Sequence, residues 1–359
     1  MRIALLTGGG DCPGLNAVIR AAVRRATLDY KWEVLGSEGG FHGLVANEFI
    51  EMGPGSVRGL LARGGTVLRS STRGNPFAYP VKLPDGTEEV RDVSAKVVEN
   101  LKARGIDALV AIGGDGTMSM SRRLGEMGVK IVGVPKTIDN DLSATDYTFG
   151  FNTAVNTAAE AIDRLQTTAE SHNRVMICEI MGRYAGWLTL YAGLAGAADI
   201  ILIPEIPYDI DKVVAKIKQR AELGISYTII ACSEGAKPIG GQLAVKVKGD
   251  ATMQEILGGS GDRLAQEIRG RVPFEVRVTV LGHIQRGGQP IPFDRILGTR
   301  LGVAAVDLIK RGEFGKIAVL RGTEIKSATM AEATGQLKLV DPKCELIETA
   351  RATGTEFGV

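Results

Sequence analysis

The sequence is poor in the features that mark secreted, disulfide-bonded or zinc-binding proteins. Four of its 359 residues are cysteine, and Cys12, Cys178, Cys232 and Cys344 are widely spaced, without a C-x-x-C pair. This spacing supports neither a disulfide framework nor a zinc site. It is typical of a protein in a reducing compartment, so we expect a cytoplasmic location.

Long apolar runs and an excess of charge of one sign are also missing. No apolar run approaches the ~18 residues of a transmembrane helix, and the first residues lead directly into a predicted strand, which leaves no room for a signal peptide. The 43 basic and 41 acidic side chains nearly cancel, to a net charge of +2. Because nucleic acids are bound largely through an excess of basic groups, we expect neither a nucleic acid nor a membrane as a partner.

Abundant glycine and alternating segments predict the fold class. Glycine accounts for 47 residues, roughly twice the usual share, which fits many tight loops between strands and helices. Strand-like runs such as Arg174 to Ile180 and Tyr227 to Cys232 alternate with helix-like runs such as Tyr184 to Ala195 and Ile210 to Ala221. The alternation predicts an α/β fold with mainly parallel sheets covered on both faces. The segment Pro76 to Glu89 is polar and predicts a surface loop or small hairpin.

Two carboxylates follow one of the predicted strands. The apolar run Lys130 to Val134 is typical of a buried strand, and Pro135-Lys136-Thr137-Ile138-Asp139-Asn140-Asp141 comes directly after it. In open α/β sheets ligands bind at the carboxyl ends of strands. Asp139 and Asp141 are therefore candidates for a proton-accepting base and for a counter-charge or metal contact. The alternative is an Asx-rich turn without a catalytic role.

Two glycine-rich loops also follow predicted strands. The strand Asp107 to Ile112 runs into Gly113-Gly114-Asp115-Gly116-Thr117, with a helix predicted from Met118 to Met127. Glycine lets the backbone approach a bulky anion, the N–H groups at a helix N-terminus can face a phosphate, and Asp115 is suited to hold Mg²⁺. The second loop, Thr7 to Gly14, follows the strand Ile3 to Leu6. For each loop the alternative is an ordinary turn without a ligand.

These motifs, with others further along, resemble the phosphofructokinase family. Glu179-Ile180-Met181-Gly182-Arg183-Tyr184-Ala185-Gly186-Trp187 is similar to that family's second substrate loop, and Val280-Leu281-Gly282-His283-Ile284-Gln285-Arg286-Gly287-Gly288 to its sugar-phosphate loop. Ser171-His172-Asn173-Arg174 and Ser233-Glu234-Gly235 fall between them in the family's order. The resemblance implies two Rossmann-like three-layer domains. Residues 1–150 with about 285–335 would bind the phosphoryl donor, and residues 151–284 with about 336–359 would bind fructose 6-phosphate.

The resemblance also implies an activity: transfer of a phosphoryl group from ATP to the 1-hydroxyl of fructose 6-phosphate, with Mg²⁺ as cofactor. Asp139 would be the base, Thr137 a hydroxyl donor, Arg183 a group that neutralises charge, and Asp115 the metal ligand. The residues implied for the donor are Gly9, Arg73, Gly74, Gly114, Asp115, Gly116 and Thr117. Those implied for fructose 6-phosphate are Thr137, Ile138, Asp139, Arg174, Met181, Gly182, Arg183, Glu234, Arg277, His283, Ile284, Gln285 and Arg286.

Two positions bear on the donor and point in different directions. In this family a glycine at position 116 accompanies ATP use and an aspartate accompanies pyrophosphate use, whereas a lysine at position 136 is usual in pyrophosphate-dependent members. This chain has Gly116 and Lys136. We expect ATP, because a carboxylate at position 116 would fill and repel the site of the α-phosphate, while Lys136 can attract either donor. Pyrophosphate is the alternative.

Assembly and other functions follow from the same resemblance. It implies a homotetramer, or a homodimer, in which Arg174 and Arg277 act across a subunit boundary. Two other functions stay open. Lipid kinases and NAD kinases share the Gly-Gly-Asp-Gly-Thr loop, so the acceptor could differ, although they lack the Met-Gly-Arg and Gly-His-Ile-Gln-Arg loops. A non-catalytic nucleotide or sugar-phosphate sensor is the other alternative, and it would have no need of Asp139.

Overall fold

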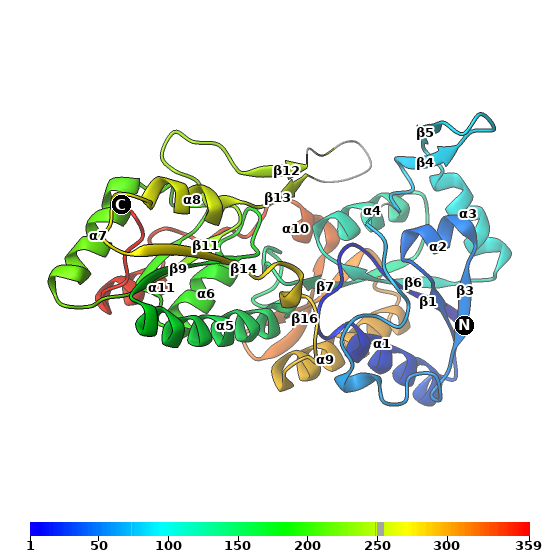
Figure 1. The fold of residues 1–359 in the computed structure, drawn as a ribbon. Helices are drawn as coiled ribbons and strands as arrows, with labels where there is room; N and C mark the ends of the chain where they lie inside the picture. Colours follow the sequence, from blue (N-terminus) through cyan, green and yellow to red (C-terminus); the bar gives the residue numbers. More distant parts are fainter. Residues whose placement is uncertain (73, 248, 250–254) are drawn as a thin grey trace.

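The computed structural model describes residues 1–72, 74–247, 249 and 255–359 of the chain. They form two halves, each built on a mainly parallel sheet with helices on both faces (Figure 1). The predicted α/β fold is confirmed. The first sheet, as far as the described ranges show it, has the order β16-β15-β7-β6-β1-β2-β3, with β8 paired to β7. Its strands are β1 (Arg2–Thr7), β2 (Glu33–Ser37), β3 (Phe49–Met52), β6 (Ala108–Gly113), β7 (Ile131–Thr137), β8 (Phe149–Gly150), β15 (Lys316–Arg321) and β16 (Glu324–Thr329).

The first sheet is covered on both faces because its central strands β1, β6 and β7 are mostly apolar on both faces. Successive side chains of a strand point to opposite faces, so Ile3 and Leu5 of β1 join one core cluster and Ala4 and Leu6 join another. The first cluster packs under α1 (Leu15–Arg24) and α9 (Pro292–Lys310). The second packs under α2 (Phe41–Ala46), α3 (Ser94–Ala103), α4 (Asp115–Glu126) and α10 (Met330–Thr334).

The second sheet has the order β10-β11-β9-β14, and all its pairings are parallel. Its strands are β9 (Arg174–Ile180), β10 (Ile200–Leu202), β11 (Thr228–Ser233) and β14 (Glu275–Val280). Helices α5 (Phe151–His172), α6 (Trp187–Ala195) and α11 (Glu345–Ala352) share the large core cluster with α1 and α9, so one continuous core joins the two halves. The other face packs against α7 (Ile210–Glu222) and α8 (Ser260–Ile268).

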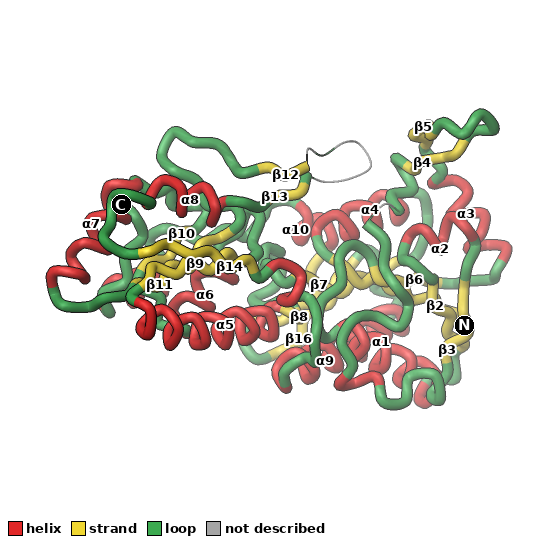
Figure 2. Tube along the Cα trace, viewed as in Figure 1, coloured by secondary structure: helices red, strands yellow, loops and turns green. Residues whose placement is uncertain are grey.

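Local boundaries follow the sequence closely, but the start of α6 differs. Strand β9 spans the predicted residues, but α6 begins at Trp187 instead of Tyr184. The carboxylate of Glu205 accepts hydrogen bonds from the backbone N–H of Gly186, at 2.9 and 3.1 Å, and so holds the preceding residues in a loop. The polar segment after Pro76 forms the predicted hairpin, β4 (Tyr79–Lys82) with β5 (Glu88–Arg91), which projects from the first half (Figure 2).

The chain passes between the halves more than once. After the second sheet is complete, α9, β15 and β16 return to the first half (Figure 1). The C-terminal residues then come back to the second half, where Glu356 bridges Ile200 of β10. Within the described part of the chain, no helix is both long enough and apolar enough to cross a membrane.

Candidate functional site

The candidate site lies where the carboxyl ends of the two sheets meet. Strands β1, β6 and β7 are parallel neighbours, so the loops that follow Thr7, Gly113 and Thr137 leave the first sheet at one edge. The side chain of Asp139, beyond β7, lies close enough to Arg183 and Glu234, beyond β9 and β11, for their charges to act on each other's ionisation. Motifs far apart in the sequence are thereby brought to one place.

The first glycine-rich loop is held by its carbonyl groups. Ser70 Oγ donates to the carbonyl of Gly9, Lys136 Nζ to that of Gly10, and Arg286 Nη1 to that of Asp11. Among the described residues, none accepts a hydrogen bond from the N–H of these three loop residues. Unsatisfied backbone N–H groups in a concave loop are suited to bind an anion. A Cβ at Gly10 would meet the Arg286 guanidinium, so a larger residue there would displace the side chain that bonds Asp11.

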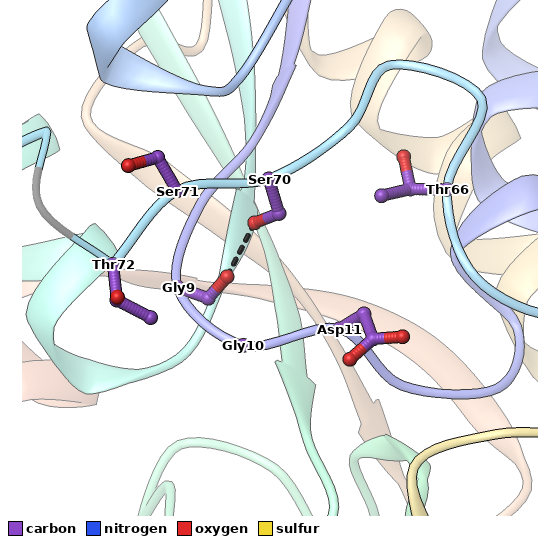
Figure 3. A pocket seen from close by; sticks show the side chains of 7 residues that line it. All are labelled: Gly9, Gly10, Asp11, Thr66, Ser70, Ser71 and Thr72. Atoms are coloured by element: carbon purple, nitrogen blue, oxygen red, sulfur yellow. Dashed lines mark hydrogen bonds between the residues drawn. The ribbon is translucent and has the colours of Figure 1, made fainter.

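A cavity of about 550 Å³ opens beside this loop. Figure 3 shows the Ser70 hydroxyl pointing at the Gly9 carbonyl on its wall. The cavity is lined by Gly9, Gly10, Asp11, Thr66, Ser70, Ser71 and Thr72. Its size suits a polyphosphate or part of a nucleotide. Thr66 and Ser70 come from a long connection after β3, and no short motif in the sequence singled them out.

The second glycine-rich loop differs from its prediction in where the helix starts. Helix α4 begins at Asp115, three residues before the predicted Met118, and the extended Gly114 precedes it. The first turn has few apolar residues, so the sequence pattern did not reveal this earlier start. Asp115 is therefore in the first turn, half-buried, and loss of water raises the pKa of its carboxyl. Thr117 is buried against Gly8 and Gly113, whereas a Cβ at Gly116 would meet no atom within 4 Å.

The loop after β7 is shaped by the residue between its two acids. Asn140 is buried and has a φ of 53°, a left-handed conformation that Asn tolerates better than most residues. Its side chain accepts a hydrogen bond from Thr148 N–H at 3.0 Å. Ile138 packs into the core, and Thr137 Oγ1 accepts from the N–H of Asp139 at 3.1 Å. These contacts hold Asp139 and Asp141 in a well-defined loop. An Asx-rich turn without a catalytic role would predict the same.

Asp139 lies among basic groups. Burial raises the pKa of its carboxyl, and the positive charges of Arg286, Arg183 and Lys136 oppose that shift. Burial also lowers the pKa of the Lys136 ammonium, which Asp139 and Asp141 counteract. A carboxylate with a raised pKa and three cations nearby is the combination expected where a proton is accepted and negative charge is neutralised.

Two further carboxyls near Asp139 have pKa values close to neutrality. Burial, together with the charge of Asp139, raises the pKa of Asp141 to about 7 and that of Glu234 to about 7. Asp115 adds to the effect on Asp141, whose buried Oδ1 has no hydrogen-bond partner in the described part of the chain. Crowded carboxylates of this kind fit a divalent cation. No three His, Cys, Asp or Glu side chains among the described residues would hold one unaided.

The three loops that follow β9, β11 and β14 of the second sheet are tied together. Met181 N–H donates to Gln285 Oε1 at 2.9 Å, and Gly182 N–H donates to Glu234 Oε1 at 3.3 Å. Ser233 Oγ donates to the Gly182 carbonyl at 2.7 Å. Met181, Gly182, Glu234 and Gln285 thus form one connected wall across from Asp139. His283 and Ile284, on the 3-10 turn Gly282–Gln285, are exposed.

Arg174 and Arg277 are not brought to this wall within the chain. Arg174 is the first residue of β9, and its partner Glu275 is the first residue of β14. Strands rise ~3.3 Å per residue, so these positions lie well away from the carboxyl edge. Glu275 pairs with Arg174 at 2.7 Å and also with Arg277. Gly74 packs against the backbone of His42, and Arg73 lies outside the described residues.

Comparisons with known proteins reveal similarity along nearly the whole chain. The phosphofructokinase family model matches residues 2–309. The ATP-dependent 6-phosphofructokinase 2 of Clostridium perfringens is 52% identical over 358 residues, which cover 99% of this chain and 98% of that protein. The pyrophosphate–fructose 6-phosphate 1-phosphotransferase of Amycolatopsis methanolica is 49% identical over 344 residues, which cover 96% of this chain and 97% of that protein.

A solved structure matches as well. Phosphofructokinase from Saccharomyces cerevisiae superposes with a TM-score of 0.78 at 29% sequence identity, over 93% of this chain and 45% of that chain. This chain therefore spans less than half the length of that solved relative.

Proposed function

Because this chain belongs to the phosphofructokinase family, we propose that it transfers the γ-phosphoryl group of ATP to the 1-hydroxyl of fructose 6-phosphate. The products are fructose 1,6-bisphosphate and ADP, and the reaction is a step of glycolysis. One observation carries the proposal: Asp139 lies among Arg183, Arg286 and Lys136 between the glycine-rich loops and the wall built from β9 and β11. Phosphoryl transfer depends mainly on positioning and charge neutralisation, which this arrangement can supply.

Asp139 acts as the base. Its carboxylate accepts the proton of the 1-hydroxyl as the oxygen bonds to the transferred phosphorus and the bond to the ADP oxygen breaks. Burial raises the pKa of Asp139, which brings a carboxylate closer to the value that suits a base near neutral pH. Arg183 neutralises charge on the transferred group, and the hydroxyl of Thr137 orients the acceptor.

Mg²⁺ would be held by Asp115 together with phosphate oxygens of the donor. The half-buried carboxylate in the first turn of α4 and the unpartnered Asp141 Oδ1 nearby support this assignment. An ion with one protein carboxylate and several phosphate or water ligands is the usual arrangement for Mg²⁺. When bound, it supplies positive charge that stabilises the transferred phosphoryl group.

The donor is ATP because of the space at Gly116. Similar relatives are named for ATP and for pyrophosphate at nearly equal identity, so their names do not choose between the two. Gly116 is exposed, and outside its own helix no atom of the described residues lies within 4 Å of where its Cβ would be, which leaves room for an α-phosphate. Lys136 donates to the carbonyl of Gly10, and that role in holding the loop serves either donor.

Fructose 6-phosphate would bind against the wall from the second sheet. Glu234 and the backbone of Met181 and Gly182 would meet the sugar, and His283 and Arg286 would meet its phosphate. We propose that Arg174 and Arg277 complete the phosphate site of a neighbouring subunit in a homotetramer. Arg174 lies at the start of β9, the end away from the site, and both arginines pair with Glu275 at the start of β14, which supports this role.

The proposed domains keep the predicted bounds, residues 1–150 with about 285–335 and residues 151–284 with about 336–359. The pairing of β15 with β7 and the bridge from Glu356 to β10 support the two crossings. A cytoplasmic location is part of the proposal and is supported by four cysteines that are all free thiols.

A coupled assay of fructose 1,6-bisphosphate formation tests the function. Purified protein is given fructose 6-phosphate and Mg²⁺ with either ATP or pyrophosphate. We expect turnover with ATP. Turnover with pyrophosphate alone would overturn the donor, and binding of both substrates without turnover would favour a sensor.

Hybrid oligomers test the shared site. Arg277→Ala and Asp139→Asn proteins are mixed through dissociation and reassembly, and are assayed at a fructose 6-phosphate concentration too low for Arg277→Ala alone to turn over appreciably. Some activity should return, because a hybrid contains shared sites in which Asp139 of one subunit and Arg277 of its neighbour are both intact. Hybrids that form without recovering activity would exclude sharing between subunits.

A further inference from the structure

The connection between α10 and α11, residues 336–341, touches the Asp139 loop although it lies beyond the part of the chain that the family model matches. Leu337 forms an antiparallel bridge with Leu142. The backbone N–H of Lys338 donates to the carbonyl of Asp141 at 2.8 Å. The connection therefore runs beside the loop that carries the proposed base.

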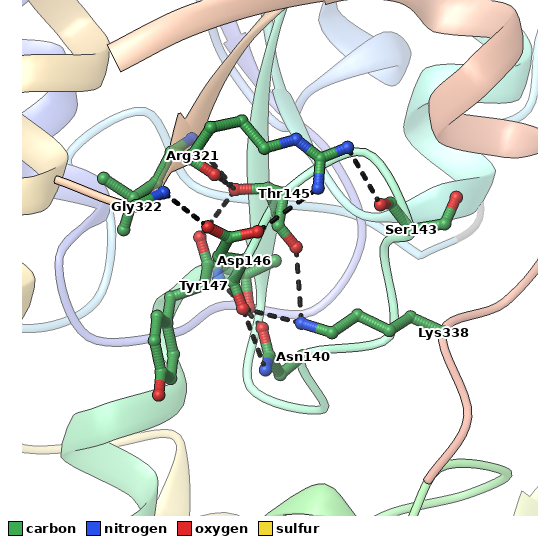
Figure 4. Close-up of polar contacts among 10 residues, drawn as sticks. Asn140, Ser143, Thr145, Asp146, Tyr147, Arg321, Gly322 and Lys338 are labelled. Atoms are coloured by element: carbon green, nitrogen blue, oxygen red, sulfur yellow. Dashed lines mark hydrogen bonds and ion pairs between the residues drawn. The ribbon is translucent and has the colours of Figure 1, made fainter. Parts of the chain in front are cut away.

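The Lys338 side chain reaches further along the same loop. Its Nζ donates to the carbonyl of Asp146 at 2.6 Å and to that of Thr145 at 3.3 Å (Figure 4). The Asp146 carboxylate is in turn fixed by Gly322 N–H at 2.6 Å and by Arg321 at 3.2 Å. The Lys338 ammonium thus links two consecutive carbonyls of the loop that also carries Asp139 and Asp141.

The same connection is tied to the second-sheet loop that carries Arg183. The carbonyl of Lys338 accepts from Trp187 Nε1 at 2.8 Å, and the ammonium lies 5.5 Å from the centre of that indole ring. Two residues on, Val340 N–H donates to Glu205 Oε1 at 2.8 Å. Glu205 also accepts from Gly186 N–H, so the connection and the start of α6 share one carboxylate.

We propose that Lys338 is a positioning residue for phosphoryl transfer, which holds the loop from Asp139 to Tyr147 against the loop before α6. The inference rests on the proposed function for its effect on catalysis. Lys338 does not touch the reacting atoms; it acts through the carbonyls of Thr145 and Asp146 and through Trp187. Its loss would leave the Thr145 carbonyl without its side-chain donor and the Asp146 carbonyl with only Asn140 Nδ2, at 3.4 Å, and would let Asp139 shift relative to Arg183. A shift of ~1 Å in a site of this kind can lower the rate by about 10²-fold.

The test compares three variants. Lys338→Met keeps the length of the side chain and removes its charge and donors, Lys338→Arg restores a cation that can reach the carbonyls and stack on Trp187, and Lys343→Met alters an exposed lysine of the same region as a control. Lys338→Met should lower kcat by about 10- to 100-fold while KM for both substrates stays near the parent values. Lys338→Arg should recover much of kcat, and Lys343→Met should match the parent.

Hydrogen–deuterium exchange of residues 139–147 gives a readout that does not need activity. Exchange there should be faster in Lys338→Met, near normal in Lys338→Arg and unchanged in Lys343→Met. Unaltered exchange and kcat in Lys338→Met would overturn the inference. Equal losses of kcat and of Tm in the Met and Arg variants would also overturn it, since they would indicate a general packing role. A parent inactive with both donors would refute the proposed function, and exchange would still decide whether Lys338 holds the loop.

Discussion

Replacing Gly116 by aspartate tests the phosphoryl donor. A Cβ at this exposed position in the first turn of α4 would meet no atom of the described residues beyond its own helix within 4 Å, so the fold can accommodate the side chain. A carboxylate near a helix N-terminus also stabilises a helix by ~0.3–1 kcal/mol. The variant should therefore fold as the parent does, and a change in activity would reflect repulsion of the donor.

The size of the effect follows from Coulomb's law. Two like charges 4 Å apart repel by ~4 kcal/mol at an effective dielectric constant of about 20 and by ~1 kcal/mol in bulk water. Because residue 116 is exposed, the cost should lie between these limits. A free energy of ~1.4 kcal/mol corresponds to a factor of ten, so kcat/KM for ATP should fall by roughly 5- to 10³-fold. Pyrophosphate has only two phosphates, equivalent to the β- and γ-phosphates of ATP, so it places no phosphate beside residue 116. Turnover with pyrophosphate should therefore fall far less.

Initial rates measure this at saturating fructose 6-phosphate, with ATP or pyrophosphate varied. Gly116→Ala is the matched control, because it adds the Cβ without the charge, and it should keep most of the ATP activity. An unchanged kcat/KM for ATP in Gly116→Asp would refute the placement of the α-phosphate beside residue 116. An equal loss in the alanine variant would refute the electrostatic explanation.

Three other perturbations examine the base, the sugar-phosphate site and the pH dependence. Asp139→Asn should lower kcat by at least ~10²-fold with little change in the Kd of fructose 6-phosphate. A kcat near that of the parent would reject Asp139 as the base. Asp163→Asn, at an exposed position, is the control. Arg277→Ala should raise KM for fructose 6-phosphate but not for ATP, through loss of charge-assisted bonds worth ~1.5–3 kcal/mol each. An equal rise of KM for both substrates in this variant would contradict the assignment. Arg286→Ala should raise both KM values, because Arg286 also bonds Asp11. Since burial raises the pKa of Asp139, kcat/KM should decline, as pH falls, at a pH above the ~3.9 of a free aspartate. A decline centred near pH 4 in the parent would argue against a buried base.

The sequence predicted the features that depend on neighbouring residues. The bounds of β9, the hairpin after Pro76 and the positions of the glycine-rich loops all follow from local apolar periodicity and turn residues. The start of α4 was predicted too late, because Asp115 and Gly116 carry no apolar signal and only the extended Gly114 marks the end of the loop.

Contacts between distant segments had no such signal. The bond from Arg286 to the Asp11 carbonyl, the bond from Lys136 to Gly10 and the lining of the cavity by Thr66 depend on the packing of strands that are far apart in the chain. Lys338 is a further case, since its partners Thr145 and Asp146 are nearly two hundred residues away. Nothing around Lys338 in the sequence distinguishes it from a surface lysine.

Neighbouring strands of the first sheet are far apart in the chain, and this has a consequence for synthesis on the ribosome. Strand β7 is completed at Thr137, but its neighbour β15 begins only at Lys316. At 5–20 residues per second, roughly 10–40 s separate the two. During that interval the backbone of β7 that later pairs with β15, at Val132 and Gly133, is an unpaired strand edge within an apolar segment. Exposed apolar edges recruit other strands. A nascent chain stalled before Lys316 would therefore be prone to aggregate, and chaperones that bind apolar segments would be needed most during this stage of translation.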